Sequence, residues 1–253
     1  MEYLFLIKDY LLVGFMITLV GIGHVFNLRS KIDQIIHEKN PDVVCVELDE
    51  KRYHALLIQH KENYVKRNSS LPVIYRILAK FQDTAAKWYG VHAGDEMLTA
   101  LQTAREMNTP VVFIDMDAQI LFKEMLHSMP LREKIRLLLS SISSLFATKS
   151  MVEKELMKLQ SNYDRFLREV EKRFPTVKKT LIDKRNVFMV EQLQDLTQRY
   201  SKIVAVVGDG HIPGMERLLK SRNVEVETIR LKKLIGDNDT GRTVSFKLTY
   251  TQP

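Results

Sequence analysis

The chain has 253 residues, of which 45% are hydrophobic, a composition typical of a globular protein with a sizeable buried core. Its single cysteine, Cys45, excludes an internal disulfide framework and favours a reducing compartment, so we expect a cytoplasmic protein. The net charge of +7 comes mostly from residues 119–200, which hold 16 Lys and Arg against 10 Asp and Glu. No aromatic interleaving or known module accompanies this basic excess, so we expect no nucleic-acid partner. A solvated helical face explains it best, followed by peripheral contact with an anionic membrane surface or an acidic partner.

The N-terminal residues 10–28 are mostly apolar and long enough to suggest a membrane span. Three glycines, His24 and Asn27 interrupt the run, and no basic cluster precedes it as in a signal peptide. We therefore expect strands here rather than a membrane span.

Apolar runs and helical patterns then alternate along the first half of the chain. Strands are expected at 17–20, 43–48 and 111–115, with helices at 27–39, 50–66 and 94–107 and an amphipathic region at 72–88. The first helix ends at Asn40, because a residue before proline is pushed out of the helical region. Asp49 can cap the second helix. Strands separated by helices of this length predict a mainly parallel sheet.

The alternation stops between residues 119 and 200, where apolar residues at helical spacing predict an insertion of two to four helices. It resumes with a strand at 203–207, a helix at 213–222 and a strand at 224–229. The alternating stretch 243–250 predicts an antiparallel edge strand. The expected fold is therefore α/β, a mainly parallel sheet flanked by helices with a helical insertion. Residues 1–253 would form one domain, with an α/β core at 1–118 and 201–253.

Two Gly-x-Gly-His units follow predicted strands, one near each end of the chain. They end at His24 and His211, and Glu47 and Asp115 also lie at the ends of predicted strands. In a parallel sheet all carboxyl ends meet at one edge, where ligands bind. Two imidazoles and one or two carboxylates at such an edge form a divalent metal site or an acid–base site.

Each of these residues also has a structural explanation. Either histidine can be a hydrogen-bonded group of its glycine turn, and Glu47 can belong to a buried ion pair, for which Arg52 is one partner. Arg52 lies in the first turn of a helix, where the macrodipole disfavours a cation, so it is expected to face Glu47 or an anionic substrate. Asp115 or Asp117 can cap the next helix.

Other catalytic motifs are missing from the sequence. It contains no G-x-S-x-G elbow, P-loop or H-E-x-x-H motif. The two glycine turns also lack the third glycine of a dinucleotide-binding fingerprint.

Several stretches together resemble the TraB/PrgY family, which is related to the Tiki proteins. They are GIGHVFNLRSKIDQII with PDVVCVELDEKRYHALL, GDEMLTALQTAREMNTPVVFID, and LIDKRNVFMVEQL with VAVVGDGHIPGMERLL, within residues 17–222. The family's Gly-x-x-His motifs fall on Gly21/His24 and Gly208/His211. Its strand glutamate, helix arginine and late-helix arginine fall on Glu47, Arg52 and Arg185. Where many members have an Asp-Arg pair, this chain has Asp115-Met116.

The resemblance implies an α/β core with metal-dependent proteolysis in the Tiki branch and inhibition or capture of a peptide pheromone in PrgY. The first hypothesis is thus a metal-dependent, peptidase-like hydrolase using Mn²⁺, Co²⁺ or Zn²⁺. Its assigned residues are His24, His211 and Glu47 as metal ligands, Glu47, Arg52 and Arg185 in catalysis, and Asp115 and Asp209 in substrate binding. The alternative is a non-catalytic protein that binds a peptide or small molecule in the same crevice.

Overall fold

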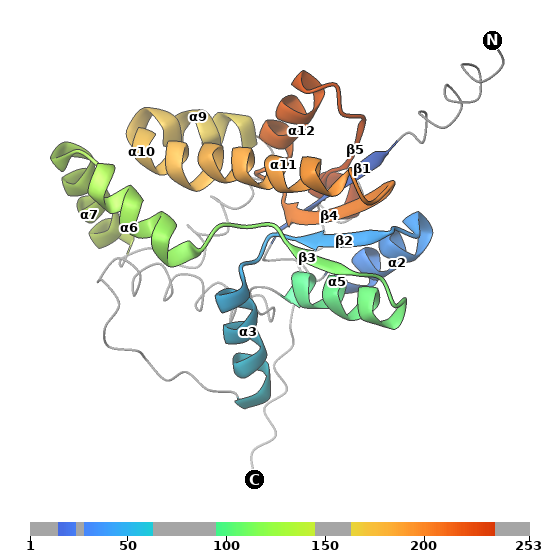
Figure 1. The fold of residues 1–253 in the computed structure, drawn as a ribbon. Coiled ribbons are helices and arrows are strands. Elements are labelled where there is room, and N and C mark those ends of the chain that lie inside the picture. The colour runs from blue at the N-terminus through green and yellow to red at the C-terminus, as the bar shows by residue number, and fades with distance from the viewer. Residues whose placement is uncertain (1–14, 24–27, 63–94, 145–162, 236–253) are drawn as a thin grey trace, which may run out of the picture.

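The computed structural model describes residues 15–23, 28–62, 95–144 and 163–235 (Figure 1). His24, the amphipathic region 72–88 and the expected edge strand 243–250 lie outside these residues. Within the described part of the chain, no helix has the length and apolar character needed to cross a membrane.

The described strands form one parallel sheet. They are β1 (Met16–Ile22), β2 (Val43–Val46), β3 (Val111–Phe113), β4 (Lys202–Gly208) and β5 (Val226–Ile229). Their order in the sheet is β3-β2-β4-β1-β5, and each neighbouring pair is parallel. The central strands read as continuous apolar runs because helices cover both faces of the sheet. The parallel α/β architecture predicted from the sequence is thus confirmed.

Helices pack on both faces of this sheet (Figure 1). On one face, α2 (Arg29–Lys39) and α5 (Asp95–Glu106) contribute Ile32, Ile36 and Met97 to a core shared with strand residues such as Val44. On the other face, α11 (Arg185–Leu196) and α12 (Ile212–Ser221) pack against neighbouring strand residues. Alternate strand side chains point to opposite faces, so each strand contributes to both cores.

Local backbone chemistry fixes several helix ends. Asn40 adopts the left-handed conformation at φ 43° and ends α2, as its position before Pro41 suggested. Asp49 accepts a hydrogen bond from Arg52 N at 3.0 Å in α3 (Glu50–Glu62), and a longer one from Ala118 N at 3.4 Å. Asp49 therefore ties the first turn of α3 to the start of α6 (Ala118–Ser128).

In the segment 119–200, the described residues 119–144 and 163–200 are mostly helical. After α6 it contains α7 (Leu131–Ser144), α9 (Tyr163–Arg173), α10 (Pro175–Lys178), the π-helix η1 (Lys179–Lys184) and α11. The last three follow one another without a break. Met189, Val190 and Leu193 of α11 are completely buried against the sheet. The last helix of the expected insertion is therefore part of the main core.

Candidate functional site

Glu47 occupies the carboxyl end of β2, immediately after Val46. Its backbone N–H donates to Val206 O of β4 at 3.1 Å, which fixes the residue beside the end of β4. Its side chain is 6% exposed. Gly208 N donates to Oε2 at 2.6 Å, and the Arg185 guanidinium donates to Oε1. The buried partner of Glu47 is therefore Arg185, and not Arg52 as one interpretation of the sequence had it.

Arg185 connects the two buried carboxylates of the site. Its Nε donates to Asp115 Oδ1 at 2.8 Å and its Nη2 to Asp115 Oδ2 at 2.7 Å, while Nη2 also reaches Glu47. The remaining nitrogen, Nη1, donates to Leu181 O of η1 at 3.3 Å. A planar fork suits this two-point contact with a carboxylate. The π-helix places Arg185 at the start of α11, and such segments often occur at functional sites.

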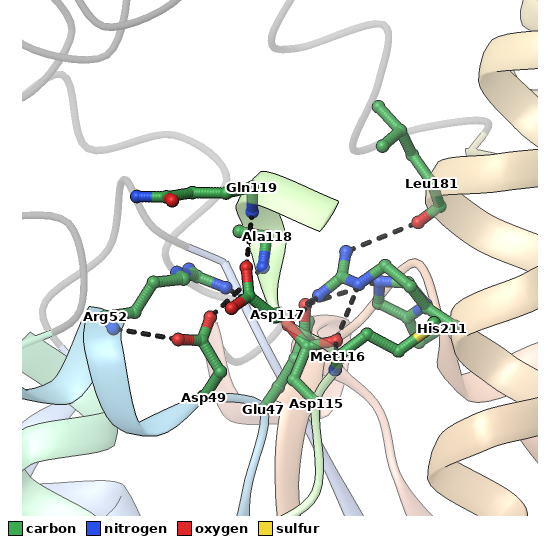
Figure 2. Close-up of polar contacts among 12 residues, drawn as sticks. Glu47, Asp49, Arg52, Asp115, Met116, Asp117, Ala118, Gln119, Leu181 and His211 are labelled. Atoms are coloured by element: carbon green, nitrogen blue, oxygen red, sulfur yellow. Dashed lines mark hydrogen bonds and ion pairs between the residues drawn. The ribbon is translucent and has the colours of Figure 1, made fainter. Parts of the chain in front are cut away.

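His211 lies next to Glu47, directly before the first residue of α12. Its Nδ1 lies 2.7 Å from Asn186 Oδ1, and its Nε2 lies 3.4 Å from Glu47 Oε1. With the amide in this orientation its oxygen accepts, so Nδ1 carries a hydrogen and Nε2 is directed at the carboxylate. The two side chains are each 6% exposed. Figure 2 shows Glu47, Asp115 and His211 gathered in one cluster.

Asp115 lies two residues beyond the end of β3 and accepts from two arginines. Besides Arg185, Arg52 Nη1 donates to its Oδ2 at 3.2 Å, and Met116 N donates to its Oδ1 at 2.8 Å. Asp115 is nearly buried, whereas the Arg52 side chain is 41% exposed and lies on the solvent side of the cluster. Of the two aspartates that could cap α6, Asp117 does so, accepting from the N–H groups of the first turn.

The charges of the cluster compensate one another. Burial acts to raise the pKa of Glu47, but His211 and Arg185, with the hydrogen bonds from His211 and Gly208 N, hold it well below its usual value. Burial acts to lower the pKa of Arg185, yet Glu47 and Asp115 raise it above its usual value. Glu47 is therefore a carboxylate, and Arg185 a cation, at neutral pH.

Asp209, expected at a substrate site, has its carboxylate engaged elsewhere. Arg230 donates from Nε and Nη2 at 2.9 and 2.8 Å, and Leu231 N donates at 2.8 Å. Its side chain also lies against Gly21, where any added Cβ would collide with it. In the structure Asp209 therefore joins the ends of β4 and β1 to the start of α13 (Leu231–Ile235).

Asn186 is a site residue that the sequence reasoning missed. It is 3% exposed and orients the His211 ring from the neighbouring helix. A signal was present, because Asn186 shares the spacing of the buried residues Met189, Val190 and Leu193 on α11. An amide at a core position of a helix requires a buried partner.

The described donors fit part of a metal site. A carbonyl oxygen holds His211 Nδ1, which is the usual support of a metal-binding histidine. Nε2, which faces Glu47, would bind a metal ion in place of the hydrogen that it directs at that carboxylate. Two donors at about 2.0–2.1 Å from a tetrahedral ion are about 3.4 Å apart, and Nε2 and Glu47 Oε1 have this separation, 3.4 Å. Within the described ranges, no three His, Cys, Asp or Glu side chains form a metal-binding group. The third expected ligand, His24, lies outside them.

A model of the TraB/PrgY/gumN family matches residues 14–228, a range that includes β1 to β4, most of β5 and the whole polar cluster around Glu47. The chain belongs to the TraB/PrgY/gumN family.

Individual relatives agree with this assignment. An uncharacterised protein of Methanocaldococcus jannaschii is 28% identical over 241 residues, which cover 92% of this chain and 60% of that protein. TraB domain-containing proteins of Bos taurus and Homo sapiens are each 24% identical over 237 residues, covering 81% of this chain and 62% of their own lengths. The chain thus spans less than two thirds of the length of each of these relatives.

Proposed function

We propose that this TraB-family chain is a metal-dependent hydrolase acting on peptides, with His211, Glu47 and His24 as the metal ligands. The observation that carries the proposal is the contact between two buried groups, His211 Nε2 and Glu47 Oε1, at the carboxyl edge of the sheet. The Asn186 carbonyl oxygen fixes the imidazole so that Nε2 faces the carboxylate. A divalent ion held there would acidify water and polarise a substrate carbonyl.

The lowered pKa of Glu47 selects between the two roles considered for it. A general base at neutral pH works best with a pKa near 7, and the surroundings of Glu47 push its pKa in the opposite direction. A permanently ionised carboxylate is instead a good metal ligand. We therefore assign Glu47 to metal binding and to electrostatic support of His211.

The two arginines have different roles in this proposal. Arg185 is buried, and its donors are used on Glu47, Asp115 and Leu181 O, so it positions the carboxylates. Arg52 is partly exposed and makes one contact of 3.2 Å with Asp115. Its guanidinium can turn toward a substrate carboxylate or toward the negative charge that develops on a peptide carbonyl.

Metal content and peptide cleavage, measured on the same preparation, test the proposal. Protein purified without chelator should retain a divalent metal and cleave members of a peptide mixture. Chelation should stop cleavage, and Mn²⁺, Co²⁺ or Zn²⁺ should restore it. Glu47→Gln and His211→Ala should lose both properties, whereas His127→Ala, a control at an exposed histidine of α6, should keep both. A folded wild-type protein with no metal affinity and no cleavage under any of these ions would refute the proposal.

A second candidate function is binding of a peptide or small molecule without catalysis. It is favoured by the hydrogen bonding of the two carboxylates within the cluster, since each oxygen of Glu47 and Asp115 already accepts at least one hydrogen bond. In that case Arg52→Gln should abolish binding of carboxylate-bearing ligands, while metal content and chelation should have no effect on it. Cleavage of any bound peptide would exclude this alternative.

A further inference from the structure

Helix α7 exposes an apolar stripe. Leu131, Ile135 and Leu139 are 71%, 50% and 61% exposed, although large apolar side chains are usually covered. Their spacing of four residues places them on one face of the helix. We call these three residues the α7 stripe.

Cationic residues flank the stripe on both sides. Arg132, Lys134 and Arg136 are exposed, and the helical repeat of 100° per residue places Lys134 on one side of the stripe and the two arginines on the other. Glu133, which is the one acidic residue of α7, is 4% exposed, and its carboxylate accepts from Thr176 N at 2.9 Å. The outward surface of α7 therefore combines apolar and cationic side chains without an acidic one.

The neighbouring helix continues this surface. On α6, Ile120 is 62% exposed, and it lines a shallow hollow together with Lys123 and Glu124 and with Lys134 of α7. Lys184 neutralises Glu124 through an ion pair. Figure 1 shows α6 and α7 side by side at one end of the molecule, projecting away from the sheet. Among the described residues, Ile120 and the α7 stripe belong to neither of the two cores that cover the sheet.

We propose that the outer face of α6 and α7 docks on a membrane surface that contains anionic lipids. An amphipathic helix with an apolar stripe between basic residues lies in the interfacial plane, with its apolar side chains among the acyl chains and its cations at the headgroups. Each Lys or Arg near an anionic leaflet strengthens the attraction. This docking is independent of the hydrolase proposal.

Other occupants of the stripe suit the observations less well. A second copy packed through the same stripe would bring the cations Arg132, Lys134 and Arg136 of the two chains close together, because a twofold interface uses the same patch on both chains. An acidic protein would need a complementary groove, whereas the stripe side chains protrude from a convex helix. A lipid surface requires charge and apolar contact but no matching shape.

Co-sedimentation with vesicles tests the proposal. The full chain should bind vesicles of phosphatidylcholine mixed with phosphatidylglycerol, bind phosphatidylcholine alone far more weakly, and lose binding as salt is raised. The triple variant L131Q/I135Q/L139Q keeps good helix formers at exposed positions and should bind at least about tenfold more weakly. R132Q/K134Q should weaken binding by about fivefold for each cation removed.

A matched control separates this surface from net charge alone. K232Q/K233Q removes two exposed lysines from α13, outside the proposed face, and should bind as the wild type does. Equal losses in K232Q/K233Q and R132Q/K134Q would overturn the proposal, as would unchanged binding of the triple glutamine variant. Self-association abolished by L131Q/I135Q/L139Q, without vesicle binding, would assign the stripe to a second copy. Binding to soluble poly-glutamate, again without vesicle binding, would assign the surface to an acidic protein partner.

Discussion

Arg185 illustrates how one residue can hold a buried ionic cluster together. The family resemblance assigns Arg185 a role in catalysis. In the structure, its Nε and Nη2 donate hydrogen bonds to Asp115, Nη2 also donates to Glu47, and Nη1 donates to Leu181 O. Arg185 is therefore expected to contribute to the stability of the fold as well as to the chemistry of the site.

Replacing Arg185 should therefore destabilise the fold in a graded way. Arg185→Gln leaves two buried carboxylates without their shared cation, and we expect a loss of about 3–5 kcal/mol in the free energy of unfolding. Arg185→Lys keeps a charge without the planar fork and should fall between the wild type and the glutamine variant. Urea unfolding measures the order, with the exposed neighbour Lys184→Gln as control. A glutamine variant as stable as that control would show that Arg185 has no structural role.

The stability contributed by Glu47 should depend on pH in a definite direction. Its folded pKa is lowered, so its contribution is fully present above the unfolded pKa of about 4.3 and is lost as the pH falls through the folded value. The difference in the free energy of unfolding between the wild type and Glu47→Gln should therefore be largest at neutral pH. It should shrink as the pH becomes acidic. Urea titrations at several pH values provide the measurement. A difference that stayed constant down to strongly acidic pH would contradict the buried carboxylate.

At the scale of elements, the close approach of α12 to α11 orients the His211 imidazole, which is proposed above as a metal ligand. Gly214 of α12 faces Asn186 of α11 so closely that an added Cβ would collide with the Asn186 amide nitrogen. The same amide holds His211 Nδ1. The helix contact is therefore linked to the orientation of the ring.

Gly214→Ala should disturb the site more than its small size suggests. The methyl group must displace the Asn186 amide, so we expect weaker metal binding and slower cleavage, with a loss of about 1–3 kcal/mol from overpacking. Asn186→Ala should reproduce the functional defect, because it removes the same hydrogen bond to Nδ1. Calorimetric metal titration and peptide assays would compare the two variants. If Gly214→Ala bound metal with wild-type affinity, the contact between α11 and α12 would have no effect on the orientation of His211.

Across the whole molecule, the features that follow from local pattern were predictable. Apolar runs such as 203–207, spaced by helical segments, predicted the parallel sheet, and the carboxyl-edge rule brought Glu47, Asp115 and His211 together. Asp49 and Asn40 also mark helix ends as their chemistry requires.

Long-range pairings were beyond what the sequence could supply. Glu47 and Arg185 are separated by 138 positions, and several cations could have served as the partner of a buried glutamate. The pairing of Asp209 with Arg230 depends on where α13 begins, which no local pattern fixes. The π-helix that precedes Arg185 arises from one extra residue in a turn, and the apolar pattern looks the same without it.

The most direct test of the central claim is an anomalous diffraction measurement on crystals grown with Mn²⁺ or Zn²⁺. The account predicts one strong anomalous peak within bonding distance of His211 Nε2 and the Glu47 carboxylate, which disappears in crystals of Glu47→Gln. A well-ordered site without any peak, in which His211 Nε2 keeps its direct contact with Glu47 in the presence of either ion, would contradict it. The cluster would then be a buried ionic network that supports the fold and the binding of anions.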